Sequence, residues 1–477
     1  MNLGQHIDID TDVETDWPKT FGGTMKTWTR VLAALIAGAL LAASCGSSDD
    51  DPVTADPPDD SVVEETEPDP DPEPDAEPEP EVDSGPVSVD QRGVTDETIA
   101  LGVAVLEFPE VLGLDWGNQQ EIWEIILQDV NDNGGVHGRQ IVPTYANYSP
   151  IDPVTADAAC VELTEDAEIF AVLGGFTGLV TDANLCFANS GVAQFGVSPE
   201  PDVAPDVPWI AVEASEERRM VLWANYLIEE GVLDGKKFAV AGFSPRESDI
   251  KENLLPVLAD AGLEPSGEFY TTYTGSDEVA LDAEMAIWAE RMNADGIEHV
   301  FLVDDGIGLV GDLIGGGYTG AASSDWTLDL ANEEATNGVD LTGVQSMSPI
   351  SDAVAWETPR VQECRDIVEA ARPDLAPIAA PGTTTTADVQ WERTVLWVCR
   401  YVDLFVVTME TATAPTHEAI LEAVTTQMSS FSVAEFEFAS FGPGKFDAND
   451  GFQPVEWDTN AGLVGQWVPI TELRNLG

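Results

Sequence analysis

The stretch that decides the fold is residues 130–141, which read Val-Asn-Asp-Asn-Gly-Gly-Val-His-Gly-Arg-Gln-Ile. It follows an amphipathic segment, residues 117–131, and leads into an apolar β-type segment, residues 140–145. Two consecutive glycines can adopt the left-handed backbone that ends a helix, and Gly138 allows a tight turn before a strand. The stretch therefore predicts the junction of a helix and a strand in an α/β layer.

The same alternation continues outward from this stretch. Short apolar runs alternate with amphipathic helical patterns from residue 97 onward, which is typical of parallel sheets with helical crossovers. Residues 215–230 form a second clear helical pattern, with Met220, Trp223 and Leu227 on one face. One such block precedes about residue 213 and another follows it. The expected strands are residues 98–106, 140–145, 169–173, 193–197, 237–242, 267–272 and 299–303.

Residues 130–139 resemble the Ile-Asn-x-x-Gly-Gly-Ile-x-Gly-Arg signature of the branched-chain amino acid type of periplasmic binding protein, the substrate-capturing component of ABC transporters. Residues 93–102, Gly-Val-Thr-Asp-Glu-Thr-Ile-Ala-Leu-Gly, resemble that family's first strand. The resemblance extends through about residue 430. It implies an α/β fold of two Rossmann-like lobes with parallel sheets and a three-strand hinge, the type I periplasmic binding fold.

The resemblance also implies the lobe boundaries. Lobe 1 would comprise residues 93–213 plus 346–441, and lobe 2 would comprise residues 214–345 plus 442–477. The ligand would lie between the lobes, which close around it. Parallel sheets favour the same place independently, because their ligands bind beyond the carboxyl ends of the strands.

Candidate ligand-binding residues in lobe 1 follow three of its strands. Trp116 resembles the family residue that covers the ligand's side chain, and ordinary packing is the alternative. The loop at residues 174–178 offers backbone N–H groups and the Thr177 hydroxyl as a cradle for a carboxylate, with Phe176 beside it. Ser198 is a second candidate hydroxyl, with a simple turn as its alternative.

Lobe 2 departs further from the family pattern. Relatives often carry a Tyr-Gly pair where this chain has residues 244–249, which include the candidate contact Glu247, so the preference for an amino acid stays open. Asp304 is a candidate partner for a ligand ammonium, and Asn332 is a further candidate contact. A plain surface position is the alternative for each. Residues 447–451 hint at a calcium loop, but their acids miss the required offsets, and we expect a turn.

The chain has five cysteines, an odd number for an exported protein. Cys45 is the odd one if it carries a lipid. For the other four, pairing of sequence neighbours is the simplest of three connectivities, and buried free thiols are the alternative. The expected pairs are Cys160 with Cys186 and Cys364 with Cys399.

The beginning of the chain reads as an export signal and a tether. Residues 25–44 combine Lys26 and Arg30 with a short apolar run, and residues 1–24 are interpreted as a non-native upstream extension. The sequence around Cys45 resembles the lipobox of bacterial lipoproteins, although ordinary cleavage and secretion is the alternative. Residues 45–92 form an acidic, proline-rich linker that should stay extended.

Composition excludes several classes of function. The chain has 88 Asp and Glu but only 19 Lys and Arg, which gives a formal net charge of −69. A charge of this sign and size would repel any nucleic acid. Residues 84–477 alone carry 66 acids and 16 bases, a net charge of −50. The four histidines are scattered without a metal-ligand spacing, so we expect no metal and no cofactor.

The sequence thus predicts an extracytoplasmic solute-binding protein, lipid-anchored to the outer face of the cell membrane or, alternatively, secreted. It would capture a small polar ligand (an amino acid, an amide or a small carboxylate) and deliver it to an ABC permease, as a monomer. A tethered sensor of the same fold is the alternative. We expect no enzyme, because a secreted hydrolase would need a Gly-x-Ser-x-Gly elbow or a Ser, His and acid set that is missing.

Overall fold

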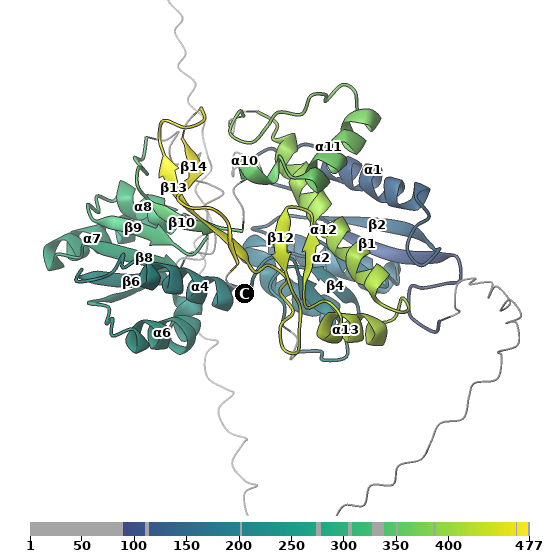
Figure 1. The fold of residues 1–477 in the computed structure, drawn as a ribbon, viewed down its shortest axis with the longest axis horizontal. Helices are drawn as coiled ribbons and strands as arrows, with labels where there is room; N and C mark the ends of the chain where they lie inside the picture. Colours follow the sequence, from purple (N-terminus) through teal and green to yellow (C-terminus); the bar gives the residue numbers. More distant parts are fainter. Residues whose placement is uncertain are drawn as a thin grey trace, which may run out of the picture. The chain divides into compact units, whose positions relative to one another are not determined.

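The computed structural model describes residues 89–109, 114–200, 203–272, 278–303, 308–326, 338–349, 352–384, 388–463 and 465–475. Strands and helices alternate along most of this length (Figure 1). The α-helices are α1 (Gln119–Asp132), α2 (Pro153–Val161), α3 (Leu185–Asn189), α4 (Glu216–Glu229), α5 (Glu247–Asp249), α6 (Leu255–Asp260), α7 (Glu278–Asp295), α8 (Leu309–Gly315), α10 (Asp352–Ala355), α11 (Pro359–Ala371), α12 (Trp391–Thr411) and α13 (His417–Thr426).

The first sheet has five parallel strands in the order β2-β1-β3-β4-β5. Its longest pairing runs in register from Thr98 opposite Gln140 to Leu106 opposite Tyr148. The expected strand at residues 98–106 is confirmed, and the other three in this sheet agree apart from their ends. The strands are β1 (Thr98–Leu106), β2 (Gln140–Tyr148), β3 (Ala171–Leu173), β4 (Ala193–Gly196) and β5 (Trp209–Ala211).

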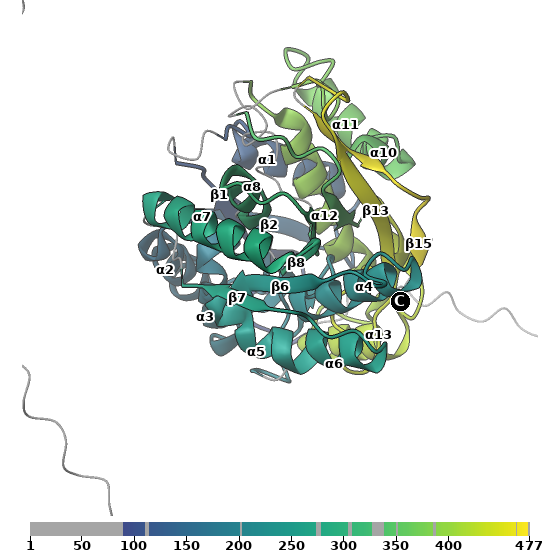
Figure 2. The same ribbon diagram turned by 90° about the vertical axis from the view of Figure 1, so that its left-hand side faces the viewer.

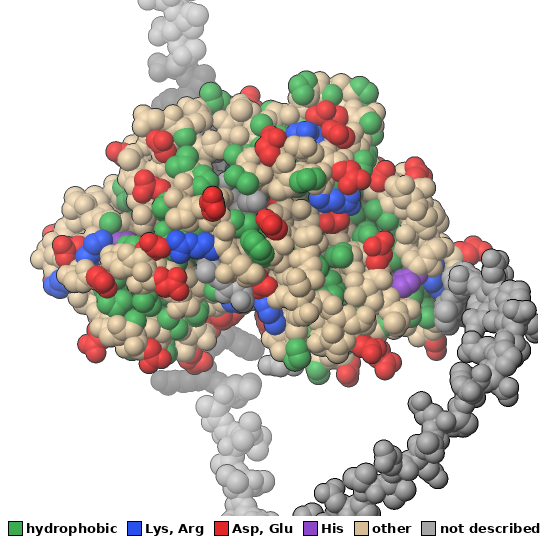
Figure 3. Space-filling view, viewed as in Figure 1, with side chains coloured by type: hydrophobic (Ala, Val, Ile, Leu, Met, Phe, Trp, Pro, Cys, Tyr) green, Lys and Arg blue, Asp and Glu red, His purple; other side chains and the backbone are tan. Residues whose placement is uncertain are grey.

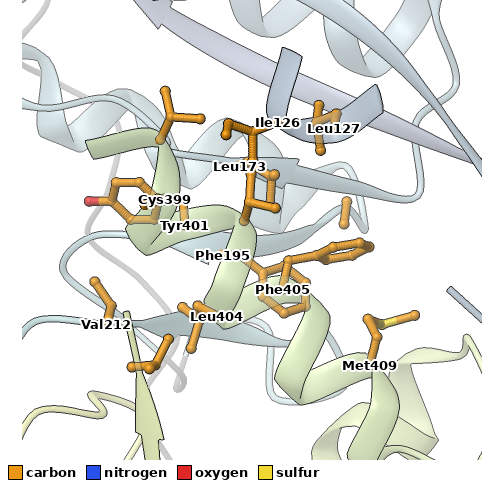
Figure 4. Close-up of a cluster of buried hydrophobic side chains, with 14 of the residues drawn as sticks. Ile126, Leu127, Leu173, Phe195, Val212, Cys399, Tyr401, Leu404, Phe405 and Met409 are labelled. Carbon is orange, nitrogen blue, oxygen red and sulfur yellow. The ribbon is translucent and has the colours of Figure 1, made fainter. Parts of the chain in front are cut away.

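Helices cover both faces of the first sheet because its strands are apolar on both faces. Ile99, Leu101 and Val103 of β1 pack into a core with α1, α11, α12 and α13, whereas Ala104 and Leu106 pack into a second core with α2 and α3. Figure 4 shows α12 lying across the sheet in the first of these cores. There the rings of Phe195 and Phe405 meet edge to face at 5.1 Å.

The stretch that joins α1 to β2 has the predicted backbone. Gly134, Gly135 and Gly138 all have positive φ, at 111°, 69° and 68°. A side chain at Gly135 would place its Cβ 1.9 Å from the carbonyl oxygen of Arg139, so only glycine fits. Gly135 therefore fixes the register in which β2 enters the sheet.

The second sheet has the order β14-β13-β10-β9-β8-β6-β7, with β15 paired to β13. Strands β6 to β10 are parallel, and β13 runs antiparallel to β10. The strands are β6 (Phe238–Phe243), β7 (Glu268–Thr271), β8 (His299–Val303), β9 (Ala321–Ser324), β10 (Gln345–Ser348), β13 (Gly451–Asp458), β14 (Gln466–Pro469) and β15 (Arg474–Asn475). A separate hairpin consists of β11 (Phe431–Val433) and β12 (Phe436–Ala439).

Helices also lie on both faces of the second sheet, as Figure 2 shows. Ala239 and Ala241 of β6 face the core shared with α7 and α8, whereas Phe238 and Val240 face the core shared with α4 and α6. Alternate side chains of one strand thus enter different cores, as the pleat requires. Acidic side chains are spread over the face seen in Figure 3 and do not gather in one patch.

The expectation of a turn at residues 447–451 is wrong. The turn lies earlier, between Gly442 and Lys445, and Asp447 instead pairs with Ala211 as an extended bridge. Asp447 and Asp450 are buried at 4% and 5% exposure. Carboxylates and Gly451 suggested a solvent-exposed turn, but tertiary ion pairs described below bury this segment.

Candidate functional site

The candidate site lies at the carboxyl ends of β1 to β4. These strands are parallel, so the loops that follow them meet at one edge of the first sheet. Glu107 and Phe108 follow β1, Ser149 follows β2, Thr177 lies in the loop after β3, and Ser198 follows β4. Three of the sequence-predicted residues, Trp116, Thr177 and Ser198, therefore belong to the segments around this edge or to the start of α1.

The loop after β3 is held by two buried polar side chains. Asn184 is 1% exposed, and its Oδ1 accepts the Phe176 backbone N–H at 2.8 Å while its Nδ2 donates to the Phe176 carbonyl at 2.8 Å. The Thr177 backbone N–H donates to the Tyr148 hydroxyl at 3.2 Å, and the hydroxyl oxygens of these two residues are also 3.2 Å apart. The N–H groups of Phe176 and Thr177 are therefore already bonded within the chain, and the carboxylate cradle in this loop stays a prediction.

Aromatic rings form a continuous wall at this edge. Trp116 meets Phe108 at 4.8 Å and Trp397 at 6.1 Å, and Trp397 meets Tyr401 at 4.8 Å, each pair edge to face. Trp116 is only 8% exposed, so its ring is largely covered by its neighbours. This packing favours the alternative interpretation of Trp116, which is ordinary packing.

Phe176 belongs to the same apolar core as Trp116. Its side chain is fully buried, stacks on Phe187 at 5.1 Å and meets Tyr148 edge to face at 4.9 Å. Its backbone N–H and carbonyl are both bonded to Asn184, so Phe176 is a packing residue of this loop. The ring therefore shapes the loop that presents Thr177.

The other predicted site residues lie on other segments of the chain or outside the described residues. Ser198 is half-buried and has a positive φ of 42°, an uncommon conformation for a residue with a side chain. Glu247 begins α5, after β6 of the second sheet, and forms an ion pair with Lys251. Asp304, Asn332 and Cys45 lie outside the described residues.

A pocket opens beside the aromatic wall, between the end of β1 and the start of α1. Its volume is about 400 Å³, within the range of roughly 300–1,000 Å³ that is usual for small-molecule sites. We call it the β1–α1 pocket; its lining includes Glu107, Phe108, Asp115, Trp116, Asn118, Gln119, Gln120 and Asn147.

Tyr148 and Tyr401 both keep their protons at neutral pH. Burial raises the pKa of Tyr148 to about 12 despite the lowering effect of the Thr177 hydrogen bonds. Burial also raises the pKa of Tyr401, and the nearby Glu213 carboxylate raises it further. Both phenols are therefore neutral, and Tyr148 uses its hydroxyl to bond Thr177.

Two clusters of ions join the segments that connect the sheets. Arg218, at the start of α4, bonds to Asp447 at 3.1 Å and to Asp450 at 2.5 Å, and Lys445 lies 3.2 Å from Asp450. The Ser215 backbone N–H also donates to Asp447 at 2.7 Å. These contacts tie the segment after β5 to the segment before β13.

The second ion cluster surrounds Arg400 of α12. Its guanidinium bonds to Glu435 at 2.8 Å and also pairs with Glu213, which follows β5. Burial raises the pKa of Glu435. A scarce cation of this acidic chain is thus used where chain segments far apart in the sequence meet.

The cysteines pair as expected. Cys160 of α2 is bonded to Cys186 of α3, with their Cα atoms 6.4 Å apart, and Cys364 of α11 is bonded to Cys399 of α12, with Cα atoms 6.2 Å apart. The first bond links the two helices that flank the loop holding Thr177. The second links α11 to the helix that carries Trp397 and Arg400.

Sequence reasoning missed Tyr148, Asn184 and Trp397. Tyr148 lies three residues beyond the end of the predicted strand, and only the full length of β2 brings it to Thr177. Trp397 lies more than 200 residues from the β3 loop, so only the packing of α12 on the first sheet reveals it. Asn184 offered no distinguishing signal, because Thr181 and Asp182 just before it are also polar.

Two searches of the described residues have a negative result. No group of three or more His, Cys, Asp or Glu side chains is arranged to hold a metal ion. No described helix combines the length and the apolar character needed to cross a bilayer.

Comparisons with known proteins identify the fold. No family model matches the sequence, and no curated protein matches it. Among solved structures, an ABC transporter substrate-binding protein from Desulfitobacterium hafniense in complex with Leu is similar, with a TM-score of 0.51 and 15% identity over 78% of this chain and 100% of that chain.

Two further solved structures agree. A solute-binding protein of an ABC transporter from Rhodopseudomonas palustris HaA2, in complex with p-hydroxybenzoic acid, has a TM-score of 0.57 and 15% identity over 80% of this chain and 98% of its own. The leucine-binding protein LivK from Thermotoga maritima has a TM-score of 0.56 and 13% identity over 80% and 99%. The chain therefore has the type I periplasmic binding fold. The three similar structures are described as binding proteins of transporters and not as enzymes.

Proposed function

We propose that this protein is an extracytoplasmic solute-binding protein that captures a small molecule and delivers it to an ABC permease. The observation that carries the proposal is the fold, since solved substrate-binding proteins match along 95% or more of their own length. The aromatic wall and the hydroxyl groups at the carboxyl edge of the first sheet support it. This is the edge where parallel sheets bind their ligands.

In this proposal the chain has two lobes, residues 93–213 plus 346–441 and residues 214–345 plus 442–477, and closure around the ligand stabilises the closed state. Trp116, Thr177 and Ser198 would contact the ligand from lobe 1, and Phe176 would shape the loop that holds Thr177. Glu247, Asp304 and Asn332 would contribute from lobe 2.

The proposal includes a tether. A lipid on Cys45, followed by the acidic linker, would hold the binding domain at the outer face of the membrane. In polyproline geometry of about 3.1 Å per residue, the linker of some 40 residues would reach on the order of 100 Å. Mass spectrometry of the N-terminal peptide from protein made in a bacterial host tests this, because lipidation adds a defined mass to Cys45.

Thermal unfolding of the full chain tests the capture role. The panel contains amino acids, amides, small carboxylates, aromatic acids and sugars, in high salt. A ligand present at about a hundred times its Kd stabilises the native state by roughly 2.7 kcal/mol, which gives a readable rise in Tm. A rise with one chemical class supports capture, and no rise with any class contradicts it.

A further inference from the structure

The β1–α1 pocket has an unusual balance of polar groups. Its lining includes the carboxylates of Glu107 and Asp115 and several side-chain amides, and none of its described lining residues is a Lys, Arg or His. Glu107 accepts a hydrogen bond from Asn147 at 2.7 Å, and Asp115 accepts one from the Gly117 N–H at 2.8 Å. An ionised carboxylate has about four acceptor positions, so both retain capacity for a ligand.

Two buried groups of this lining lack partners. Trp116 is 8% exposed and Gln119 is 3% exposed, and neither the Trp116 Nε1–H nor the Gln119 Oε1 has a hydrogen-bond partner in the described part of the chain. Buried polar groups are normally bonded, and an unbonded one costs free energy. One is a donor and the other is an acceptor, so a molecule that satisfies both must accept and donate hydrogen bonds.

Two arginines on α12 or at the end of α11, the helices that pack against α1, are already engaged. Arg372, which reaches α1, pairs with Glu121 and with Asp374. Arg400 pairs with Glu213 and Glu435. A ligand carboxylate in the β1–α1 pocket would therefore meet two carboxylates without a described cation to neutralise it.

We propose that the β1–α1 pocket binds an uncharged ligand with neighbouring hydroxyl groups, a sugar or a polyol. This inference rests on the proposed solute-binding function and names its ligand class. Hydroxyl groups both donate and accept, so they match Glu107, Asp115 and Gln119 Oε1 as acceptors and Trp116 Nε1 as a donor. The half-buried ring of Phe108 offers an apolar surface to the C–H face of such a ligand.

Two other ligand classes fit this lining less well. A small carboxylate would be repelled by Glu107 and Asp115. An ammonium ion would suit those carboxylates, but it cannot accept a hydrogen bond and would leave Trp116 Nε1–H unbonded. Of these three classes, only hydroxyl groups satisfy both kinds of partner.

Isothermal titration of the full chain in high salt tests the inference. The probes are pentoses, hexoses, disaccharides, linear and cyclic polyols, leucine, 4-hydroxybenzoate and choline. We expect binding of at least one sugar or polyol. Trp116→Phe, which keeps a ring and deletes the donor, and Gln119→Met, which deletes the acceptor, should each weaken it about threefold to tenfold, as expected for one neutral hydrogen bond.

Matched variants elsewhere control for general effects. Trp467→Phe removes another indole N–H without a partner, on β14, and Gln194→Met removes another buried amide, on β4. Neither should change the Kd for the sugar or polyol by more than about twofold, because neither residue lines the pocket. Circular dichroism of each variant confirms that it is folded.

The outcomes separate this inference from the proposed function. If leucine, 4-hydroxybenzoate or choline binds and no sugar or polyol does, the solute-binding function stands and the hydroxyl-ligand inference is overturned. If a sugar binds but Trp116→Phe and Gln119→Met bind it as tightly as the controls do, its place in this pocket is overturned. If no probe of any class binds to folded protein, both proposals fail.

Discussion

The carboxyl ends of the two sheets are held by different kinds of interaction. In the first sheet, the loop after β3 is held by neutral hydrogen bonds from Asn184 and Tyr148, close to a disulfide. In the second sheet, the segment after β6 is held by ion pairs, in which Arg246 lies 2.7 Å from Glu216 and 2.9 Å from Asp249. Salt screens partly exposed ion pairs but leaves neutral and covalent bonds almost unchanged.

This difference shows how an acidic chain can hold one sheet edge by bonds that salt does not screen. All five cysteines lie outside residues 214–345 and 442–477, so the second sheet and its helices lack a covalent link of this kind. The first edge should keep its geometry over a wide range of salt, whereas the second should respond to it. Five changes test this contrast, beginning with the largest expected effect.

Removing the disulfide next to the β3 loop should have the largest effect. The Cys160→Ser/Cys186→Ser double variant releases a link between residues 26 apart in sequence, and the chain-entropy relation gives a loss of about 3 to 4 kcal/mol in the free energy of unfolding. Urea unfolding in high salt measures it. Cys45→Ser is the control and should leave stability unchanged. An unchanged midpoint in the double variant would remove the covalent part of the contrast.

Arg218→Met tests the ion cluster that ties the segment after β5 to the segment before β13. It leaves Asp447 and Asp450, both buried, with Lys445 as their remaining described cation. Because the Arg218 side chain is 21% exposed, we expect a loss of about 2 to 3 kcal/mol, below the value for a fully buried pair. Arg474→Met, which breaks a pair with the exposed Glu230, is the control and should cost under about 1 kcal/mol. Equal losses would show that burial of the junction adds nothing.

Asn184→Ala tests the neutral clamp on the β3 loop. It leaves the buried N–H and carbonyl of Phe176 without a side-chain partner, so we expect a loss of about 2 kcal/mol, nearly the same at low and high salt. Urea unfolding at two salt concentrations measures both features. Asn133→Ala, at an exposed helix end, is the control. A loss that disappears in high salt would contradict a neutral clamp.

His299 should make the second sheet sensitive to acid. It is 1% exposed and hydrogen-bonded to Ser323 at 2.9 Å, and burial lowers its pKa from 6.5 to about 4. Below pH 6.5 the unfolded chain therefore protonates His299, whereas the folded chain does not until the pH approaches 4. The free energy of unfolding is therefore highest above pH 6.5 and decreases as the pH falls toward 4. Between pH 7 and pH 5 this amounts to roughly 1 to 2 kcal/mol.

His299→Gln should therefore flatten the pH dependence of the unfolding midpoint between pH 7 and pH 5. His417 is the matched residue of the first half, because burial lowers its pKa too. If only His417→Gln flattened the curve, the acid sensitivity would come from His417 and not from the second sheet.

Arg246→Gln should have the smallest effect. It removes a partly exposed cation near Glu216, Glu217 and Asp249, so we expect a loss of up to about 1 kcal/mol at low salt that shrinks in 1 M salt. Lys251→Gln, on the same segment, is the control and should leave the unfolding midpoint unchanged. A loss that persists in 1 M salt would mean that Arg246 acts by packing.

The sequence by itself determined the alternation of strands and helices. Apolar runs such as residues 98–106 indicate a strand that is buried on both faces. Gly134, Gly135 and Gly138 indicate a left-handed backbone, because only glycine adopts it freely. Each pattern depends only on residues close together in the sequence. The disulfide pairing was also predictable, because pairing of sequence neighbours is the simplest of the three connectivities. Short or polar strands such as β9, β10 and β13 were missed, because only pairing within the sheet makes them strands.

The tertiary structure alone decided which groups surround the candidate site. Trp397 and Tyr148 come from distant elements, and the burial of Asp447 depends on Arg218, more than 200 residues away in sequence. The sequence suggested free N–H groups in the loop that holds Thr177, but those of Phe176 and Thr177 donate to Asn184 and Tyr148. Whether a polar group is free or bonded depends on how the folded segments pack against one another, and the order of residue types does not show it.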